Sequence, residues 1–164
     1  MSETIAIDSG LSKKEKYETL HPQLVALMDG EPDAIANTAN TVAALKDAFG
    51  FFWVGFYFVR TKDTVEELVL GPFQGPIACT RISKGKGVCG KAWADKQTVI
   101  VPDVELFPGH IACNAASKSE IVIPVIKNNV VIAILDVDSD RINDFNEDDK
   151  YGLEKISTLI ASLL

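Results

Sequence analysis

The stretch that decides the fold spans residues 120–138 and reads EIVIPVIKNNVVIAILDVD. The polar tripeptide at 127–129 separates two segments rich in Val and Ile, a pattern typical of a β-hairpin. The second segment, residues 130–137, is almost wholly apolar, which predicts a strand buried on both faces. Pro124 lies in the first segment and has no N–H to donate, so part of that strand should be an edge or carry a bulge.

Helical patterns lie outside this hairpin, towards both ends of the chain. Apolar residues at spacings of three and four predict helices over residues 13–28 and 35–49, and Asn146 is a plausible N-cap for a last helix. Pro22 lies inside the first of these segments, so we expect a kink there or two short helices. Residues 1–12 lack such a pattern and should form a loose end.

Short strands and loops fill the centre of the chain, beginning with a strand over the aromatic run at 51–59. The other expected elements are strands at 67–70, 77–82, 98–101 and 120–126, a short helix at 88–94, a glycine–proline loop at 71–76 and a long irregular segment at 104–119. A long irregular segment in a compact domain is often functional. The sequence shows no repeat or domain boundary, so the order predicts a single α+β domain over residues 1–164, with helices packed on an antiparallel sheet of about six strands.

The composition limits the classes of function. Of the 164 residues, 47% are hydrophobic and 24% are charged, which is typical of a folded protein. A formal charge of -7 argues against nucleic acid or an anionic membrane as a partner. No apolar run approaches the roughly 18–20 residues that cross a bilayer. The N-terminus has acids and no apolar core, so no secretory signal is expected, and we predict a cytoplasmic protein with reduced thiols.

The three cysteines are an odd number, which makes a closed disulfide framework implausible. They are buried inert thiols, metal ligands or catalytic thiols. Cys89 begins the expected short helix beside several lysines, where the helix terminus and the cations would lower its pKa. Cys113 lies in the long irregular segment near His110, which could stabilise a thiolate. Cys79 has only Arg81 nearby, and these rules do not rank Cys89 against Cys113.

A metal site is only weakly supported. The cysteine spacings contain no Cys-x-x-Cys pair, although His110 lies three residues before Cys113 and keeps a mixed site open. A papain-like cysteine–histidine pair is conceivable, but the local signature of that family is absent. We therefore expect no metal.

Three carboxylates stand at strand positions. Glu120 begins one expected strand and Asp138 ends another, and both could be ordinary solvated ends. Asp136 follows five apolar residues, so its carboxylate should be hydrogen-bonded, raised in pKa, or both. Side chains alternate between the two faces of a strand, so Asp136 and Asp138 lie on the same face. Repulsion between their negative charges should raise the pKa of one of the two carboxyl groups. A carboxylic acid kept protonated in this way can protonate a poorly basic oxygen.

The same periodicity divides the aromatic strand and puts Trp53, Gly55 and Tyr57 on one face. A glycine between two large rings should leave a notch where a small ligand can approach. The alternative is a plain aromatic core strand, which composition alone favours.

Four motifs together resemble the free methionine-R-sulfoxide reductases, which are GAF-domain enzymes. They are Trp-Val-Gly-Phe-Tyr at 53–57, Leu-Gly-Pro-Phe-Gln-Gly-Pro-Ile-Ala-Cys at 70–79, Gly-Lys-Gly-Val-Cys-Gly at 85–90 and Leu-Asp-Val-Asp-Ser at 135–139. The similarity runs from about the second helix to the C-terminus and implies a GAF-like fold. It also implies an oxidoreductase that reduces free L-methionine-R-sulfoxide and not sulfoxide within proteins.

The resemblance implies a role for each cysteine. The residue at the position of Cys113 attacks the sulfoxide sulfur, methionine leaves, and Cys113 becomes a sulfenic acid. Cys79 then condenses with it to a disulfide, which thioredoxin reduces by thiol exchange. Cys89 matches a third cysteine with an auxiliary role. No metal or organic cofactor is implied.

The resemblance also implies a substrate site, whose residues would be Glu120, Asp136, Asp138, Trp53, Tyr57 and Asp103. The strand carboxylates would bind and polarise the substrate, one supplying a proton and the others holding the ammonium group. The two aromatic side chains would close an apolar pocket around the S-methyl group, and Asp103 is a further candidate for the amino group. The family tends to form dimers, so a homodimer is expected as well. The rival interpretation is a GAF-type small-molecule sensor with incidental cysteines, which would need neither the Cys79 and Cys113 pair nor an acidic cluster.

Overall fold

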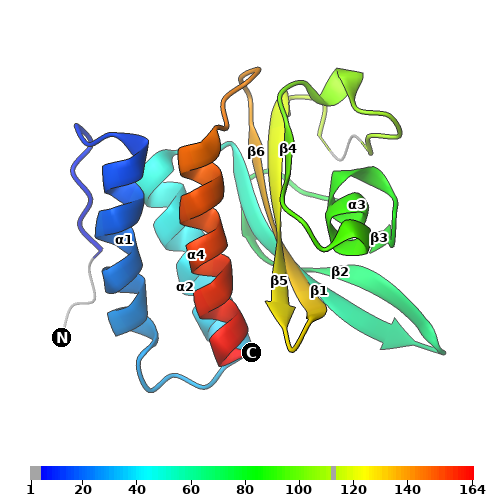
Figure 1. The fold of residues 1–164 in the computed structure, drawn as a ribbon, viewed down its shortest axis with the longest axis horizontal. Helices are drawn as coiled ribbons and strands as arrows, with labels where there is room; N and C mark the ends of the chain where they lie inside the picture. Colours follow the sequence, from blue (N-terminus) through cyan, green and yellow to red (C-terminus); the bar gives the residue numbers. More distant parts are fainter. Residues whose placement is uncertain (1–4, 112–113) are drawn as a thin grey trace.

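A six-stranded antiparallel sheet, ordered β3-β2-β1-β6-β5-β4, divides the molecule into two sides (Figure 1). The strands are Trp53–Lys62 (β1), Val65–Gln74 (β2), Arg81–Ser83 (β3), Val99–Val101 (β4), Ser119–Lys127 (β5) and Val130–Ser139 (β6). The structure is a computed structural model that describes residues 5–111 and 114–164.

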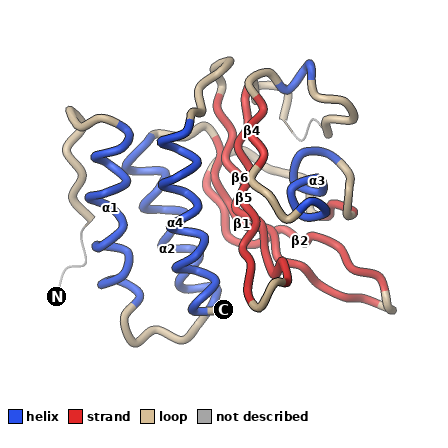
Figure 2. Tube along the Cα trace, viewed as in Figure 1, coloured by secondary structure: helices blue, strands red, loops and turns tan. Residues whose placement is uncertain are grey.

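Three long helices lie on one side of the sheet, and they are α1 (Lys13–Met28), α2 (Ala34–Phe49) and α4 (Glu147–Leu163). Helices α2 and α4 contact the strands, while α1 packs against the other two helices. The short helix α3 (Gly87–Asp95) and the 3₁₀ turn η1 (Val104–Leu106) lie on the other side (Figure 2). No helix of the described residues is long and apolar enough to cross a membrane.

The predicted hairpin is confirmed as the β5–β6 pair at the centre of the fold. Asn128 and Asn129 both adopt left-handed backbone angles, with φ of 51° and 62°, as a tight hairpin turn requires. Strand β6 lies between β1 and β5, and most of its side chains are buried. On the outer side of β5, the short strand β4 pairs only as far as Val122. Pro124 therefore lies beyond that pairing, next to a register shift after Val125, as its missing N–H predicted.

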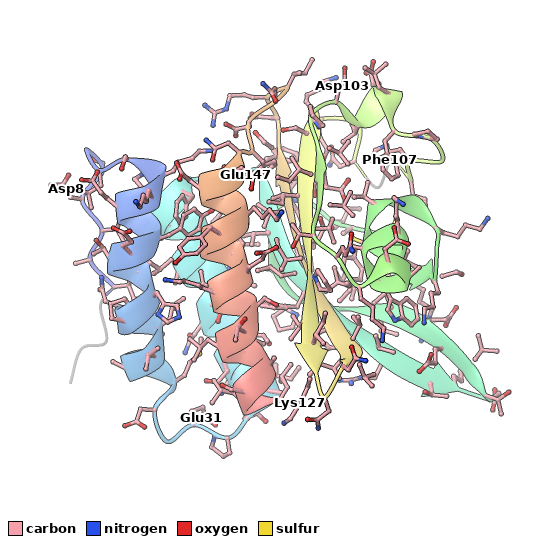
Figure 3. All side chains as sticks on the ribbon, in the orientation of Figure 1. Asp8, Glu31, Asp103, Phe107, Lys127 and Glu147 are labelled. Atoms are coloured by element: carbon pink, nitrogen blue, oxygen red, sulfur yellow. The ribbon has the colours of Figure 1, made fainter. Side chains whose placement is uncertain are left out.

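The two faces of β1 are also confirmed. Val54, Phe56 and Phe58 pack in the core under the long helices, whereas Trp53 and Tyr57 pack in a second core under α3. The last helix begins at Asn146 as predicted, with a capping box that Asn146 forms with Asp149. Figure 3 shows side chains filling the spaces on both sides of the sheet.

The two short helices that Pro22 could have produced are not formed, since α1 runs as one helix from Lys13 to Met28. Pro22 has no N–H, so the backbone carbonyl of Glu18 lacks its usual hydrogen-bond donor within the helix. Both residues are exposed, so water can donate to that carbonyl instead. Leu20 and Leu24, on either side, are fully buried and hold the helix to the core.

Two boundaries around the glycine–proline loop are also wrong. Strand β2 extends to Gln74 because residues 71–74, expected as a loop, pair with β1 across a register shift between Gly55 and Tyr57. Pro72 is tolerated there because β3 pairs with β2 only at Glu67–Val69 and leaves its other edge free beyond. Strand β3 begins only at Arg81, so residues 77–80 are not a strand.

Candidate active site

The strand register gathers the three predicted carboxylates on the face of the sheet that α3 covers. Asp138 of β6 lies directly across from Glu120 of β5 and, on its other side, from Trp53 of β1. Asp136 is on the same face and lies across from Gly55. Because neighbouring strands are only about 4.8 Å apart, these carboxylates share one small region.

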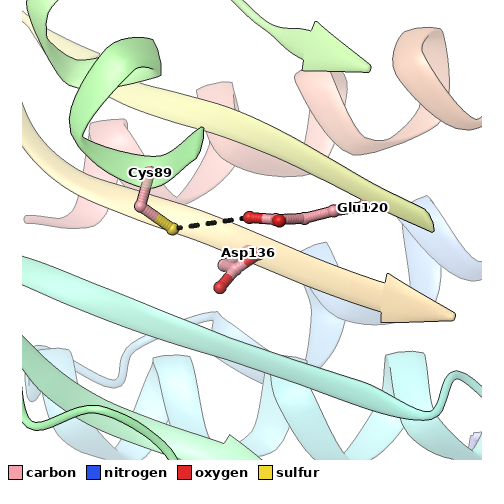
Figure 4. Close-up of side chains that lie close together, drawn as sticks. All are labelled: Cys89, Glu120 and Asp136. Atoms are coloured by element: carbon pink, nitrogen blue, oxygen red, sulfur yellow. Dashed lines mark hydrogen bonds between the residues drawn. The ribbon is translucent and has the colours of Figure 1, made fainter. Parts of the chain in front are cut away.

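Helix α3 adds a thiol to this group. The Cys89 side chain is buried, and its Sγ lies 4.0 Å from Oε1 of Glu120. One donor atom from each of Cys89, Glu120 and Asp136 lies within 4.8 Å of the others (Figure 4). Helix α3 sits close to β3 because Gly90 has no side chain: a Cβ there would lie 2.5 Å from the carbonyl oxygen of Ser83.

A pocket that is partly open to solvent lies over these groups. Trp53 and Tyr57 supply apolar walls, and His110, Asn114 and Ser117 add polar lining. Sequence reasoning did not single out Asn114 or Ser117, and the only signal for them was the length of the irregular segment that carries them. Apolar walls above an acidic floor suit a small molecule that has both a cationic group and an apolar part.

The two aromatic side chains also hold the chain segment that leads to Cys79. The indole Nε1 of Trp53 donates to the carbonyl oxygen of Pro76 at 3.0 Å. The hydroxyl of Tyr57 donates to the carbonyl oxygen of Cys79, also at 3.0 Å. Trp53 stacks on Phe73 with ring centres 5.5 Å apart. The pocket wall and the position of Cys79 therefore depend on the same two side chains.

The notch expected at Gly55 is occupied. A Cβ on Gly55 would lie 2.5 Å from the Trp53 ring and 2.5 Å from Cβ of Phe73. The glycine therefore makes room for the indole to lie flat across the sheet, and the indole itself becomes the wall of the pocket. The prediction that a ligand approaches Gly55 directly is wrong.

The electrostatics of the carboxylates follow from their burial. Burial raises the pKa of Glu120 and of Asp136 well above the ordinary carboxyl value, and repulsion by the neighbouring carboxylates adds to the rise. Burial raises the pKa of Asp138 to about 6, although a hydrogen bond from Ser117 opposes the rise. None of the recorded ion pairs among the described residues joins a Lys or Arg to these three carboxylates. Burial thus favours the protonated form of Glu120, whereas the pKa of about 6 lets Asp138 ionise more readily near neutral pH.

The low thiol pKa expected for Cys89 at a helix terminus is wrong. Burial raises the pKa of Cys89 well above the ordinary thiol value, and the negative charges of Asp136 and Glu120 raise it further. The nearby lysines do not offset this effect: Lys91 pairs with Asp95 at 2.7 Å, on the outside of the helix. Cys89 is therefore a neutral thiol at physiological pH and a poor nucleophile.

The other two cysteines differ from Cys89 in what the structure describes. Cys89 is a free thiol, whereas Cys79 takes part in a disulfide. Cys113, the predicted nucleophile, lies outside the described residues.

Asp103, the further candidate for the amino group, is not part of this pocket. Its Oδ1 accepts a hydrogen bond from the backbone N–H of Glu105 at 3.0 Å and caps the turn η1. Figure 3 labels it at the edge of the fold. The structure therefore gives Asp103 a capping role.

The raised pKa of Asp138, about 6, makes a prediction about stability. Between the ordinary carboxyl value near pH 4 and pH 6, the folded protein binds more protons at this site than the unfolded chain does. Protonation of Asp138 therefore stabilises the fold below about pH 4, and this contribution is lost as the pH rises through about 6. The free energy of unfolding of the wild type, minus that of Asp138→Asn, should accordingly decrease between pH 4 and pH 7.

Urea denaturation of both proteins at several pH values measures this difference. Asp140→Asn is the matched control, because Asp140 is exposed and its replacement should give a flat difference. A wild-type advantage that grows with pH would contradict the direction of the shift.

Several known proteins are similar to this chain in sequence. The family model described as "GAF domain" matches residues 31–164. The chain is 59% identical over 160 residues to GAF domain-containing protein A of Dictyostelium discoideum, covering 98% of this chain and 99% of that protein. It is 44% identical over 155 residues to the free methionine-R-sulfoxide reductase of Escherichia coli, covering 94% of this chain and 92% of the relative.

A solved structure extends the likeness to three dimensions. It is the free methionine-R-sulfoxide reductase of Neisseria meningitidis in complex with its substrate, with a TM-score of 0.91 and 45% identity. The match covers 98% of this chain and 95% of that one. The α+β GAF-like fold expected from the sequence is confirmed.

Proposed function

The chain belongs to the GAF-domain family of free methionine-R-sulfoxide reductases, and from this premise we propose that it reduces free L-methionine-R-sulfoxide to methionine. The observation that carries the proposal concerns Oδ1 of Asp136, on the floor of the pocket. This carboxylate oxygen is buried and has no hydrogen-bond partner among the residues that the structure describes. An unpartnered buried oxygen is costly. The ammonium group of a free amino acid would satisfy it, whereas a methionine sulfoxide within a peptide has no such group.

Asp136 and Asp138 hold the ammonium group in this proposal. Asp138 supplies the negative charge, because its pKa of about 6 leaves it ionised at neutral pH. Asp136 supplies the free acceptor. The aromatic walls formed by Trp53 and Tyr57 take the S-methyl group, since they are the apolar part of the same pocket.

Glu120 supplies the proton for the sulfoxide oxygen. Burial and the neighbouring carboxylates raise its pKa, so the side chain carries a proton at neutral pH. Nε2 of His110, at the side of the pocket, lies 3.7 Å from Oε2 of Glu120. That distance is too long for a hydrogen bond, but one small movement of His110 would let it return a proton from solvent after each turnover.

The sulfur chemistry follows from the family resemblance. The Cys113 thiolate attacks the sulfoxide sulfur while Glu120 protonates the sulfoxide oxygen. The resulting hydroxyl group then transfers to the sulfur of Cys113 as the bond between the two sulfurs breaks, so methionine leaves and Cys113 becomes a sulfenic acid. The Cys79 thiol attacks that sulfenic sulfur, water departs, and a disulfide forms. Thioredoxin then transfers two electrons and returns both thiols.

Two observations support this division of roles. Cys79 takes part in a disulfide in the structure. Cys89 is a poor candidate for the nucleophile because burial raises its thiol pKa. Its place beside Glu120 gives Cys89 an auxiliary role in the pocket. None of these steps uses a metal or an organic cofactor.

A thiol count tests the proposed reaction. The fully reduced protein has three thiols, and one of them should remain after it reacts with free methionine-R-sulfoxide in the absence of thioredoxin. One methionine should appear for each protein chain. Methionine production without thiol loss would rule out the disulfide, and neither change would rule out the reaction.

The contact between Tyr57 and Cys79 gives a second expectation for this assay. Tyr57→Phe removes the hydrogen bond to the carbonyl oxygen of Cys79, which contributes on the order of 1 kcal/mol. Disulfide formation should slow by about fivefold as the Cys79 segment loosens, while KM changes little. Stopped-flow measurement of thiol loss gives the rate. Tyr151→Phe is the matched control, since Tyr151 is an exposed residue of α4, and a raised KM with unchanged disulfide formation would contradict the assignment.

A further inference from the structure

We propose that Cys89, Glu120, Asp136 and His110 form a binding site for a thiophilic divalent cation such as Zn²⁺, which blocks the substrate pocket when it binds. The inhibitory effect depends on the proposed reductase function, whereas the binding of the cation does not. The cation is an inhibitor here, so the reaction itself still needs no metal.

The geometry places three suitable donors close together and a fourth beside one of them. The thiol sulfur of Cys89 and one carboxylate oxygen from each of Glu120 and Asp136 lie within 4.8 Å of one another. Nε2 of His110 lies 3.7 Å from the other oxygen of Glu120. In a tetrahedral zinc site the donor atoms lie about 2.0–2.3 Å from the metal, and therefore about 3.5 Å apart. The three donors, which lie within 4.8 Å of one another, would therefore have to move closer together to hold the metal.

A second observation points to a missing cation. Oδ1 of Asp136 has no hydrogen-bond partner within residues 5–111 and 114–164, although Asp136 is only 7% exposed. A fully buried acceptor of this kind is usually satisfied by a donor or a metal. A protonated amine is one possible occupant, and a metal ion is another, so the two would compete for the same oxygen.

The donor set favours a borderline or soft metal. Thiolate and imidazole ligands suit Zn²⁺ and Cd²⁺, whereas Mg²⁺ and Ca²⁺ prefer oxygen ligands alone. The recorded ion pairs of the described residues bring no Lys or Arg to Glu120 or Asp136, so no side-chain cation already neutralises them. The pocket is open to solvent, which gives a small ion a path to the donors.

The consequence for the enzyme is competition. Asp136 and Glu120 cannot hold a metal and at the same time bind the ammonium group and donate a proton. Zinc should therefore raise the KM for methionine-R-sulfoxide, and substrate should displace the metal.

The test uses a variant in which Cys89 is the one remaining thiol, Cys79→Ser with Cys113→Ser, so that zinc binding by the other two cysteines is removed. Cd²⁺ should produce one ultraviolet sulfur-to-metal charge-transfer band at one equivalent per chain. Competition with a chromophoric chelator gives the affinity for Zn²⁺. Adding Cys89→Ser should abolish the band, and Asp136→Asn, which keeps the side-chain shape, should weaken Zn²⁺ binding by about tenfold or more. A matched excess of Mg²⁺ should not compete.

Several results would overturn the site. They are the absence of a charge-transfer band from the folded variant, a band that survives Cys89→Ser, or Zn²⁺ affinity unchanged by Asp136→Asn. Circular dichroism of each variant confirms folding, and bound Zn²⁺ should raise the melting temperature of the parent variant.

Turnover by the wild type separates this inference from the proposed function. If the wild type is active in the presence of a chelator, and Zn²⁺ inhibits it competitively but inhibits Cys89→Ser less, both proposals are supported. If the wild type is active in the presence of a chelator and added Zn²⁺ does not inhibit it, the inhibitory role of the metal is wrong and the reductase function stands. If the wild type is inactive even in the presence of a chelator, the result contradicts the reductase function alone, because the spectroscopic titration tests the metal site independently.

Discussion

Cys113→Ser should lower the turnover of free methionine-R-sulfoxide by on the order of 1,000-fold or more. A serine hydroxyl is not ionised at neutral pH, so it is a poor nucleophile. Serine also has no sulfur that could take the sulfoxide oxygen and become a sulfenic acid. Cys89 does not replace it, because burial and two carboxylates raise the pKa of that thiol. Initial rates with thioredoxin, its reductase and NADPH measure the loss.

Cys79→Ser is the informative control for this experiment. It should also stop thioredoxin-driven turnover, yet it should still release one methionine per chain, because the first step needs only Cys113. A dimedone adduct at Cys113 would mark the trapped sulfenic acid. If turnover survives in Cys113→Ser, the nucleophile is Cys89 and the role given to Cys113 is wrong.

Glu120→Gln should lower kcat by about 100- to 1,000-fold. The change keeps the shape of the side chain but removes the proton that Glu120 gives to the sulfoxide oxygen. KM should change less, because Asp136 and Asp138 remain to bind the ammonium group. The variant should fold at least as stably as the wild type, since it removes a buried acid whose ionisation is costly.

Glu105→Gln is the matched control, because the Glu105 side chain is 75% exposed and pairs only with Lys118 among the recorded ion pairs of the described residues. Its kcat should equal that of the wild type. A full loss of kcat in Asp136→Asn, with Glu120→Gln unaffected, would transfer the acid role to Asp136.

Much of the fold follows from local patterns. The apolar run at 130–137 and the paired asparagines before it were sufficient to predict the central hairpin. Alternation along β1 was sufficient to divide its aromatic side chains between two cores. These features depend on residues next to each other in the sequence, which is why they could be predicted.

The errors arose where distant residues decide the outcome. Pro22 remains in one helix because of the packing of its neighbours. Strand β2 is long because residues near Phe73 find partners on β1. Neither fact is visible in the local sequence.

The candidate site shows the same division. The placement of Asp136 and Asp138 on one face was predictable from period two. Repulsion by Asp138 helps to raise the pKa of Asp136 as expected, and burial raises the pKa of Asp138 as well. The environment of Cys89 was not predictable, because Lys91 pairs with Asp95, while Glu120, 31 residues later, lies 4.0 Å from the sulfur of Cys89. The position of the Trp53 indole over Gly55 was not predictable either. Strand periodicity tells on which face of the sheet a side chain lies, but it does not tell how the side chain is tilted on that face.

The most direct test of the account is thioredoxin-coupled NADPH oxidation with three substrates: free methionine-R-sulfoxide, its S epimer and a peptide-bound methionine sulfoxide. The account predicts turnover with the free R epimer and none with the other two, because the peptide lacks the ammonium group that Asp136 and Asp138 bind. Turnover of the peptide-bound form would contradict the role of the acidic floor. No turnover of any sulfoxide by the folded and fully reduced protein would contradict the reductase function, and would favour a GAF-type sensor of small molecules.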